Sequence, residues 1–257
     1  MKIAVAGGTG VVGGYVVDVA RDRGHQVIVI SRSQGVDLRS GAGLHDALGG
    51  VEVIVDAANA ATMRGSEAAA MFTEMTRHLQ SAGAERGVAH LVTLSIVGLE
   101  RVPFGYYQAK LAHEVATKAG PLPVTIVRAT QFHEFPAQVL GRTRKGPVAL
   151  VPPMTIRPVA ARSVGEILVE VAETVAGRGG EPTALEVAGP EVAGLVGLAR
   201  AVVRHRRRHL AVVPFPVPGA AGRAMRTGGQ LPEEGARIVG PTFHDWLDTD
   251  DATRPAF

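Results

Sequence analysis

The sequence predicts an α/β fold, a Rossmann-type doubly wound parallel sheet flanked by helices, with a small C-terminal region that covers the substrate. Short apolar runs without periodicity, typical of strands buried on both faces, alternate with stretches of helical periodicity. The first run, residues 3–6, leads directly into a glycine-rich turn and then a helical pattern. This repeated alternation favours a parallel sheet with right-handed crossovers.

The glycine-rich turn predicts a dinucleotide site. Glycine permits a tight strand-to-helix turn, lets the backbone approach a pyrophosphate and lets the helix pack close to the strand. The helix N-terminus then presents free N–H groups and a partial positive charge to the phosphates. The alternative is an ordinary Gly-rich turn. The residues expected to contact the cofactor here are Gly7, Thr9, Gly10, Val11, Val12 and Gly13.

The end of the second predicted strand, residues 27–30, indicates which cofactor is bound. Ser31, Arg32 and Ser33 follow this strand, and no acidic residue stands there. An acid at this position would bind the ribose hydroxyls of NAD, whereas an arginine suits the 2′-phosphate of NADP. We therefore expect NADP(H) to be preferred over NAD(H); the alternative is that Arg32 is a solvated loop residue.

Small residues follow the third predicted strand, residues 51–55. Ala57, Ala58 and Asn59 would let the backbone lie against the adenosine and ribose of the cofactor. Asp37, next to Leu38, is a candidate acceptor for the adenine amino group. An Asp after a strand can equally well cap a helix.

A second motif predicts acid–base chemistry. Ser95 follows the apolar run 90–94, at the edge where parallel sheets bind ligands. Tyr106 and Lys110 are four residues apart on a predicted helix, so they share one face. A lysine ammonium near a phenol favours the phenolate and lowers its pKa. Such a tyrosine can donate a proton to a carbonyl oxygen while Ser95 holds that oxygen. The alternative is an exposed tyrosine with a solvated lysine. Tyr107 is a second candidate for the proton donor.

These motifs together resemble the short-chain dehydrogenase/reductase superfamily, most closely its atypical NmrA-like NAD(P)H-binding branch. The resemblance includes the turn over residues 7–13, Ser95 and Tyr106-x-x-x-Lys110, and it extends over essentially the whole chain. Many members of this branch lack the tyrosine or the lysine and bind the cofactor without turnover. This chain retains both, which favours an enzyme.

The resemblance implies a role for each matching residue. The three turn glycines hold the pyrophosphate, and Arg32 meets the 2′-phosphate. Tyr106 is the acid/base, Lys110 contacts the nicotinamide ribose and Ser95 positions the substrate. Asn59 stands where the family often has a structural Asn.

The C-terminal part is expected to form the substrate side of a single domain over residues 1–257, from roughly residue 152 onward. A predicted helix opens with a capping box from Ser163 to Glu166. Ser66 is expected to N-cap an earlier helix. Trp246 is expected to anchor the C-terminal tail. One histidine beside one acid falls far short of a metal ligand set, so no metal is expected. The segment after the strand 124–127 begins the substrate wall in the family, and the substrate candidates are Tyr107, Gln131, Phe132, His133 and Phe135.

Composition excludes several classes of protein. The chain has 257 residues, 46% of them hydrophobic and 20% charged, and no cysteine, so a disulfide framework and a cysteine nucleophile are excluded. We expect no signal peptide, no membrane span and a cytoplasmic location. The net charge is only +3. The basic run 204–209 could bind nucleic acid, but no aromatic residues are interleaved, which favours a solvated helix end and no nucleic-acid partner.

The resulting functional hypothesis is an NADP(H)-dependent oxidoreductase that reduces a carbonyl, quinone or enone of a small organic molecule. The apolar segments around the predicted pocket favour an uncharged or aromatic substrate. A redox-sensing NADP(H)-binding protein, and an epimerase, dehydratase or cyclase, remain alternatives because the fold does not fix the function. The oligomeric state is expected to be a monomer or a homodimer.

Overall fold

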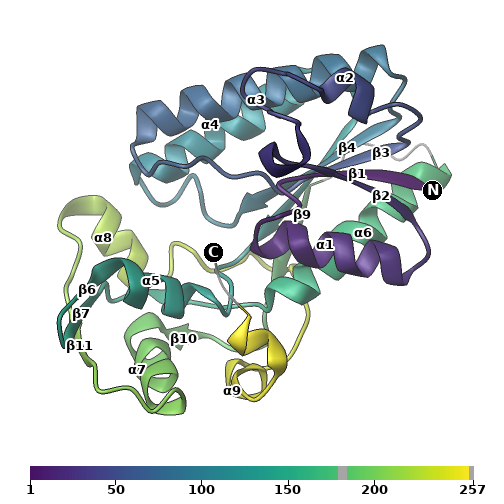
Figure 1. The fold of residues 1–257 in the computed structure, drawn as a ribbon. Helices are drawn as coiled ribbons and strands as arrows, with labels where there is room; N and C mark the ends of the chain where they lie inside the picture. Colours follow the sequence, from purple (N-terminus) through teal and green to yellow (C-terminus); the bar gives the residue numbers. More distant parts are fainter. Residues whose placement is uncertain (179–183, 255–257) are drawn as a thin grey trace. The chain divides into compact units, whose positions relative to one another are not determined.

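The computed structural model describes residues 1–178 and 184–254 (Figure 1). The chain divides into two compact units, which we call the first and the second unit. The first unit consists of Met1–Ser95, Phe104–Arg128 and Val164–Leu185, and the second of Ile96–Pro103, Ala129–Ser163 and Glu186–Phe257.

A seven-stranded sheet with the order β12-β9-β5-β4-β3-β1-β2 confirms the predicted fold class. β1 pairs in parallel with both β2 and β3, so the strand order reverses between β1 and β3. In open α/β sheets, such a switch point is where ligands bind. The strands are β1 (Lys2–Ala6), β2 (Gln26–Ile30), β3 (Val53–Asp56), β4 (His90–Ile96), β5 (Val124–Ala129), β9 (Ala184–Ala188) and β12 (Arg237–Ile238).

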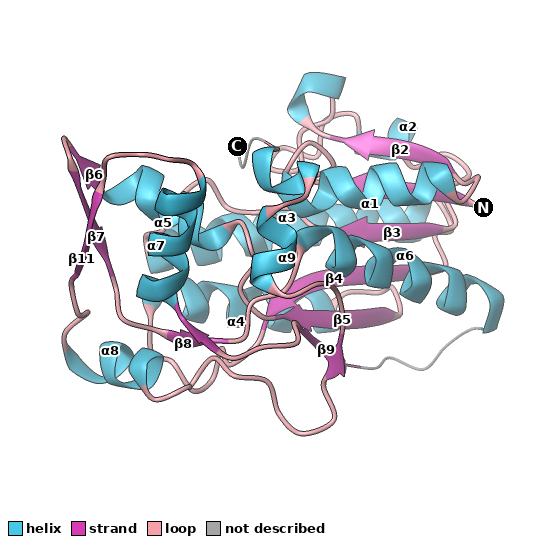
Figure 2. Cartoon of the chain, turned by 90° about the horizontal axis from the view of Figure 1, so that it is seen from below, coloured by secondary structure: helices cyan, strands magenta, loops and turns pink. Residues whose placement is uncertain are grey.

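Helices cover both faces of the sheet in the first unit. α3 and α4 lie side by side along one face, and α1 and α6 run along the other (Figures 1 and 2). Ile54 on β3, Leu79 on α3 and Leu91 on β4 belong to the hydrophobic core on the α3 side. The bounds are α1 (Val11–Asp22), the 3₁₀ helix η1 (Arg32–Gln34), α2 (Leu44–Ala47), α3 (Gly65–Glu85), α4 (Gly105–Ala119) and α6 (Ala161–Arg178).

The second unit has two small sheets besides its share of the large one. β7 (Val148–Val151) lies between β11 (Ala211–Pro214), parallel to it, and β6 (Arg144–Lys145), antiparallel to it. β8 (Thr155–Ile156) pairs antiparallel with β10 (Ala193–Gly194). The helices are α5 (Phe135–Thr143), α7 (Leu195–His205), α8 (Gly219–Arg226), α9 (Phe243–Leu247) and the 3₁₀ helix η2 (Asp250–Thr253).

Two predicted helix starts are wrong. α3 begins at Gly65 after Arg64, so Ser66 lies inside the helix and is not its N-cap. A Cβ on Gly65 would lie 2.7 Å from the Gly105 carbonyl oxygen, so the start of α3 packs closely against the start of α4. α6 begins at Ala161, which places Ser163 inside it as well. No helix of the described residues is long and apolar enough to cross a membrane.

Candidate active site

The turn after β1 requires glycine at two positions. Gly7 has φ +72°, and a Cβ there would lie 2.8 Å from the Ala57 carbonyl oxygen. A Cβ on Gly13 would lie 2.1 Å from the Gly7 carbonyl oxygen, so no side chain fits. The Gly10 N–H donates to the Gly7 carbonyl at 2.9 Å, which closes the turn at the start of α1. The turn therefore has the form that lets a backbone cradle a pyrophosphate at a helix N-terminus.

The other predicted residues of the turn differ in exposure. Thr9 is exposed, Val11 is half-buried and Val12 is buried in the core. Thr9 and Gly10, the two exposed positions, immediately precede α1, whose first N–H groups have no partner within the helix.

The segment Ala57, Ala58 and Asn59 lies at the switch point of the sheet. Ala57 and Ala58 lie so close to Gly7 that the glycine turn packs directly against the end of β3. Asp56, the last residue of β3, fixes the start of this segment, because its Oδ1 accepts the Ala58 N–H at 2.9 Å. The cofactor contact predicted for the small residues after β3 stays a prediction.

Tyr106 stands in the first turn of α4 and is buried. Its hydroxyl donates to Oδ1 of Asn59 at 2.5 Å, and its ring makes an edge contact with Phe72, with centroids 6.3 Å apart. The Tyr106 hydroxyl is therefore held beside the segment that contacts the glycine turn. The neighbouring Tyr107 is also buried, and its ring packs edge-on against Phe104.

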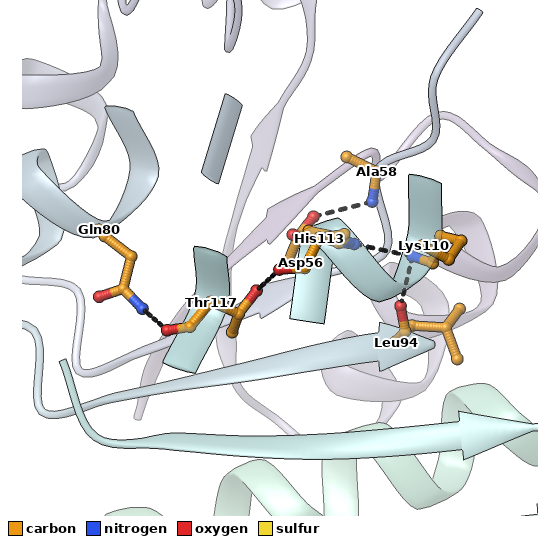
Figure 3. A network of polar contacts seen from close by, with 7 residues as sticks. All are labelled: Asp56, Ala58, Gln80, Leu94, Lys110, His113 and Thr117. Carbon is orange, nitrogen blue, oxygen red and sulfur yellow. Dashed lines mark hydrogen bonds and ion pairs between the residues drawn. The ribbon is translucent and has the colours of Figure 1, made fainter. Parts of the chain in front are cut away.

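Lys110 lies one turn further along α4, in a buried polar network (Figure 3). Its Nζ donates to the Leu94 carbonyl at 2.9 Å and lies 2.9 Å from Nδ1 of His113. Nε2 of His113 lies 3.1 Å from Oδ2 of Asp56. Because a lysine ammonium only donates, Nδ1 of His113 accepts and Nε2 carries the proton to Asp56. The imidazole is therefore neutral and oriented from both sides.

Burial governs the charges of this network. It lowers the pKa of Lys110 to about 8, although the carboxylates of Asp56 and Glu114 oppose the shift. Burial and the Lys110 cation lower the pKa of His113. Burial alone would raise the pKa of Asp56, but the hydrogen bond from His113 brings it below its usual value. At neutral pH the network thus combines a lysine cation, a neutral histidine and a carboxylate.

Ser95 lies on β4 and is buried. Its hydroxyl has no hydrogen bond of good geometry among the described residues, and it is near Glu114 of α4. Both oxygens of Glu114 accept from Arg128, at 2.9 and 2.7 Å. Burial raises the pKa of Glu114, but Arg128 lowers it overall, so Glu114 is held as a carboxylate. Ser95 therefore lies between β4 and α4, where Lys110 also bonds the Leu94 carbonyl of β4.

The residues predicted at the ribose end follow β2. The Ser31 and Ser33 hydroxyls are 2.9 Å apart, and the Arg32 side chain is exposed with no ion pair among the described residues. Asp37 accepts the Arg39 N–H at 3.0 Å, so it stabilises its own turn. Leu38 packs against the core. Arg32 is therefore the residue here whose charge is available to a ligand.

Four predicted substrate residues belong to the second unit. His133 is fully buried, packs on Phe243 and Trp246, and its Nε2 donates to the Pro241 carbonyl. Burial lowers the pKa of His133 to about 4, so it is neutral. Gln131 is buried, and Phe132 and Phe135 are half-buried. Within the described residues, no group of three or more His, Asp or Glu side chains could hold a metal ion.

Three participants in the network were not predicted from the sequence: Phe72, Asp56 as an acceptor, and His113. Phe72 stacks on His113, with centroids 4.7 Å apart, and lies under the Lys110 ammonium. His113 follows Lys110 by three residues, so helical spacing alone places it on the same face. That spacing was the available signal.

Comparison with known proteins shows the fold. No family model and no curated protein matches the chain. A short-chain dehydrogenase/reductase superfamily protein from Agrobacterium tumefaciens with bound NAD is 18% identical, with a TM-score of 0.66. The match covers 99% of this chain and 97% of that protein's chain. Citrobacter sp. triphenylmethane reductase complexed with NADP(H) is 18% identical with a TM-score of 0.64, covering 90% and 91%.

A third similar structure is UDP-glucose-4-epimerase from Stenotrophomonas maltophila with bound NAD, which is 13% identical with a TM-score of 0.67 and covers 96% and 91% of the two chains. These structures share their fold with the chain over most of its length. At these identities the likeness extends to the fold and not to a reaction.

Proposed function

We propose that the chain is an NADP(H)-dependent oxidoreductase that reduces a carbonyl, quinone or enone of a small, uncharged or aromatic molecule, with Tyr106 as proton donor. One observation carries the proposal. The segment after β3 contacts the glycine turn through Ala57 and Ala58 and holds the Tyr106 hydroxyl through Asn59. A cofactor cradle and an acid therefore adjoin the same three residues. Similar structures with bound NAD or NADP(H) support the choice of a nicotinamide cofactor.

A side chain at position 7 or 13 would collide with backbone, and a strand-to-helix turn that requires glycine in this way is the form that suits a dinucleotide pyrophosphate. The turn and the α1 N-terminus would hold the pyrophosphate, and Arg32 the 2′-phosphate. The nicotinamide, when bound, supplies the hydride that reaches the substrate carbon. The protein's own residues supply the proton and the charge.

In the reduction of a carbonyl, the Tyr106 hydroxyl turns its proton from Asn59 to the substrate oxygen and becomes a phenolate. The Lys110 cation stabilises that phenolate, and solvent returns the proton. Two of the three donors of the Lys110 ammonium are already engaged, by Leu94 and His113, so its position is fixed before substrate binds. Ser95 orients the substrate oxygen in this proposal.

The test is oxidation of NADPH, followed by absorbance, against a panel of quinones, enones and aromatic ketones. We expect turnover with at least one member. Gly13→Ala should weaken NADPH binding by at least about tenfold, or about 1.4 kcal/mol, because its Cβ would collide with the Gly7 carbonyl. The matched control is Gly197→Ala on α7, where a Cβ meets nothing within 4 Å, and this variant should behave as wild type.

The outcomes separate the alternatives. Tight NADPH binding without turnover of any acceptor would favour a redox sensor over an enzyme. Equal NADPH affinity of wild type and a folded Gly13→Ala variant would mean that the cofactor does not bind at the glycine turn. No binding of NADPH or NADH at all would overturn the proposal.

Arg32→Ala tests the cofactor preference. The guanidinium is exposed and unpaired among the described residues, and a charge-assisted contact to phosphate contributes roughly 1.5–3 kcal/mol. We expect NADPH affinity to fall by about ten- to a hundredfold and NADH affinity to change less than about twofold, measured by isothermal titration. Arg39→Ala, an exposed arginine of the same loop, is the control. Equal losses for both cofactors would refute the phosphate role of Arg32.

A further inference from the structure

A pocket of about 240 Å³ lies within the second unit, between α5, α7 and the chain that leads from α7 to β11. Its apolar lining includes Leu140 of α5, Val202 of α7 and Leu210 before β11. Water occupies roughly 30 Å³ per molecule in the liquid, so the pocket has room for about eight waters. It is larger than an inorganic phosphate requires and too small for a whole dinucleotide.

Three arginines line the same pocket: Arg144, Arg206 and Arg208. None of them forms an ion pair within the described residues. Arg206 donates to the Ala252 carbonyl at 2.9 Å and Arg144 to the Gly146 carbonyl at 3.0 Å, and both acceptors are uncharged. Burial and the neighbouring Arg208 lower the pKa of Arg206, as expected for two cations that lie close together.

The turn at the end of α7 brings two of these arginines to one place. The Arg206 N–H donates to the Val202 carbonyl and the Arg208 N–H to the Val203 carbonyl, each at 3.0 Å. Arg207 between them has φ +48°, the one positive φ outside glycine among the described residues. A left-handed residue commonly ends a helix in this way. The chain thus turns back, and Arg206 and Arg208 line the pocket while Arg204 does not.

The C-terminal ends of α5 and α7 do not balance the positive charge of the three arginines in the pocket. α5 and α7 both end beside the pocket, and a helix C-terminus carries roughly half a negative charge. Two ends therefore offset about one of the three guanidinium charges. About two positive charges remain, which is close to the charge of a phosphate monoester dianion at neutral pH, roughly −1.5 to −2.

We propose that this pocket is a second ligand site, separate from the glycine turn, that binds a small organic phosphate monoester with an apolar substituent. The guanidiniums of Arg144, Arg206 and Arg208 bind the phosphate oxygens, and bidentate contacts of this kind are among the strongest in proteins. The apolar lining around Leu140 and Leu210 buries the substituent. The site lies at the basic run 204–209, which the sequence alone predicted to be only a solvated helix end.

Titration of the full chain with phenyl phosphate tests the site. We expect saturable binding that weakens at least about tenfold in Arg208→Ala and in Arg144→Ala, which remove guanidiniums from two different segments. Arg204→Ala is the matched control, because Arg204 belongs to the same basic run but does not line the pocket; its affinity should stay within about twofold of wild type. Inorganic phosphate should bind at least about tenfold more weakly than phenyl phosphate, since it leaves the apolar lining unused.

Three results would overturn the proposal. One is the absence of saturable binding, with the fold of the protein checked by circular dichroism. Another is equal weakening in Arg204→Ala and Arg208→Ala, which would indicate a diffuse basic surface, as for a nucleic acid. The last is loss of phenyl phosphate binding in Arg32→Ala, which would assign the ligand to the dinucleotide site. Because Arg32→Ala should otherwise leave this affinity unchanged, failure here is distinguishable from failure of the proposed reductase activity.

Discussion

Tyr106→Phe is expected to lower kcat for a carbonyl substrate by about 10²- to 10⁴-fold, the usual contribution of a positioned general acid. The substitution removes only the hydroxyl, so the edge contact of the ring with Phe72 remains. Asn59, which loses its donor, is exposed and accepts from water instead. Affinity for NADPH should therefore change less than about threefold, and the melting temperature should stay near that of wild type. Steady-state kinetics measure kcat, isothermal titration measures the affinity, and thermal denaturation measures the melting temperature.

Tyr107→Phe provides a matched control on the same helix. Tyr107 is buried to the same extent as Tyr106, but its ring packs on Phe104. We expect Tyr107→Phe to retain most of the kcat. If Tyr107→Phe loses turnover while Tyr106→Phe keeps it, the acid has been assigned to the wrong tyrosine. If both variants keep turnover on a ketone, the proton does not come from either phenol and the proposed mechanism fails.

The first unit was largely predictable from the sequence because its signals are local. Strands that are buried on both faces appear in the sequence as continuous apolar runs. The spacing of the glycines predicts the strand-to-helix turn. The spacing of Tyr106 and Lys110 correctly placed both residues on one helix. The third strand begins at Val53 rather than Val51, since the Val51 N–H closes a turn onto Leu48 instead of pairing with β1.

The contact between His113 and Asp56 was not predictable, because it depends on tertiary packing. Asp56 ends a strand and His113 lies within a helix, far from it in the sequence, and neither position shows by itself that the two meet. The short strands β6, β8 and β12 have two residues each, too few for a periodic pattern. The pocket between α5 and α7 was missed for the same reason: Leu140 and Leu210 come together only in the folded second unit.

Trp246, by contrast, was expected to hold the C-terminal tail, and it is buried against Phe243 and His133. A single tryptophan among aromatic and apolar neighbours is a strong local signal of burial. It also provides an optical probe of the second unit, since the chain has only one tryptophan.

Glu134→Gln is expected to stabilise the second unit at alkaline pH. Glu134 is buried, and neither carboxylate oxygen has a hydrogen bond of good geometry among the described residues. Burial raises its pKa from the ordinary 4.5 to about 7, and the nearby Asp251 adds to this shift. Between these pH values the native state binds more protons than the unfolded state, so the free energy of unfolding falls as pH rises. Above pH 7 this shift of the pKa lowers the free energy of unfolding by about 3 kcal/mol.

The glutamine of this variant stays neutral at every pH, so it does not lose stability by ionising. The free energies of unfolding of wild type and Glu134→Gln should differ little at pH 4.5 and by up to about 3 kcal/mol at pH 8. Urea denaturation followed by Trp246 fluorescence at several pH values measures the difference within the second unit itself. Glu191→Gln is the control, because Glu191 is exposed in the same unit and its replacement should give no pH-dependent gain. Parallel stability curves for wild type and Glu134→Gln would mean that the Glu134 carboxylate is solvated or paired in solution. A gain confined to alkaline pH would instead identify Glu134 as a buried carboxyl whose ionisation weakens the second unit near neutrality.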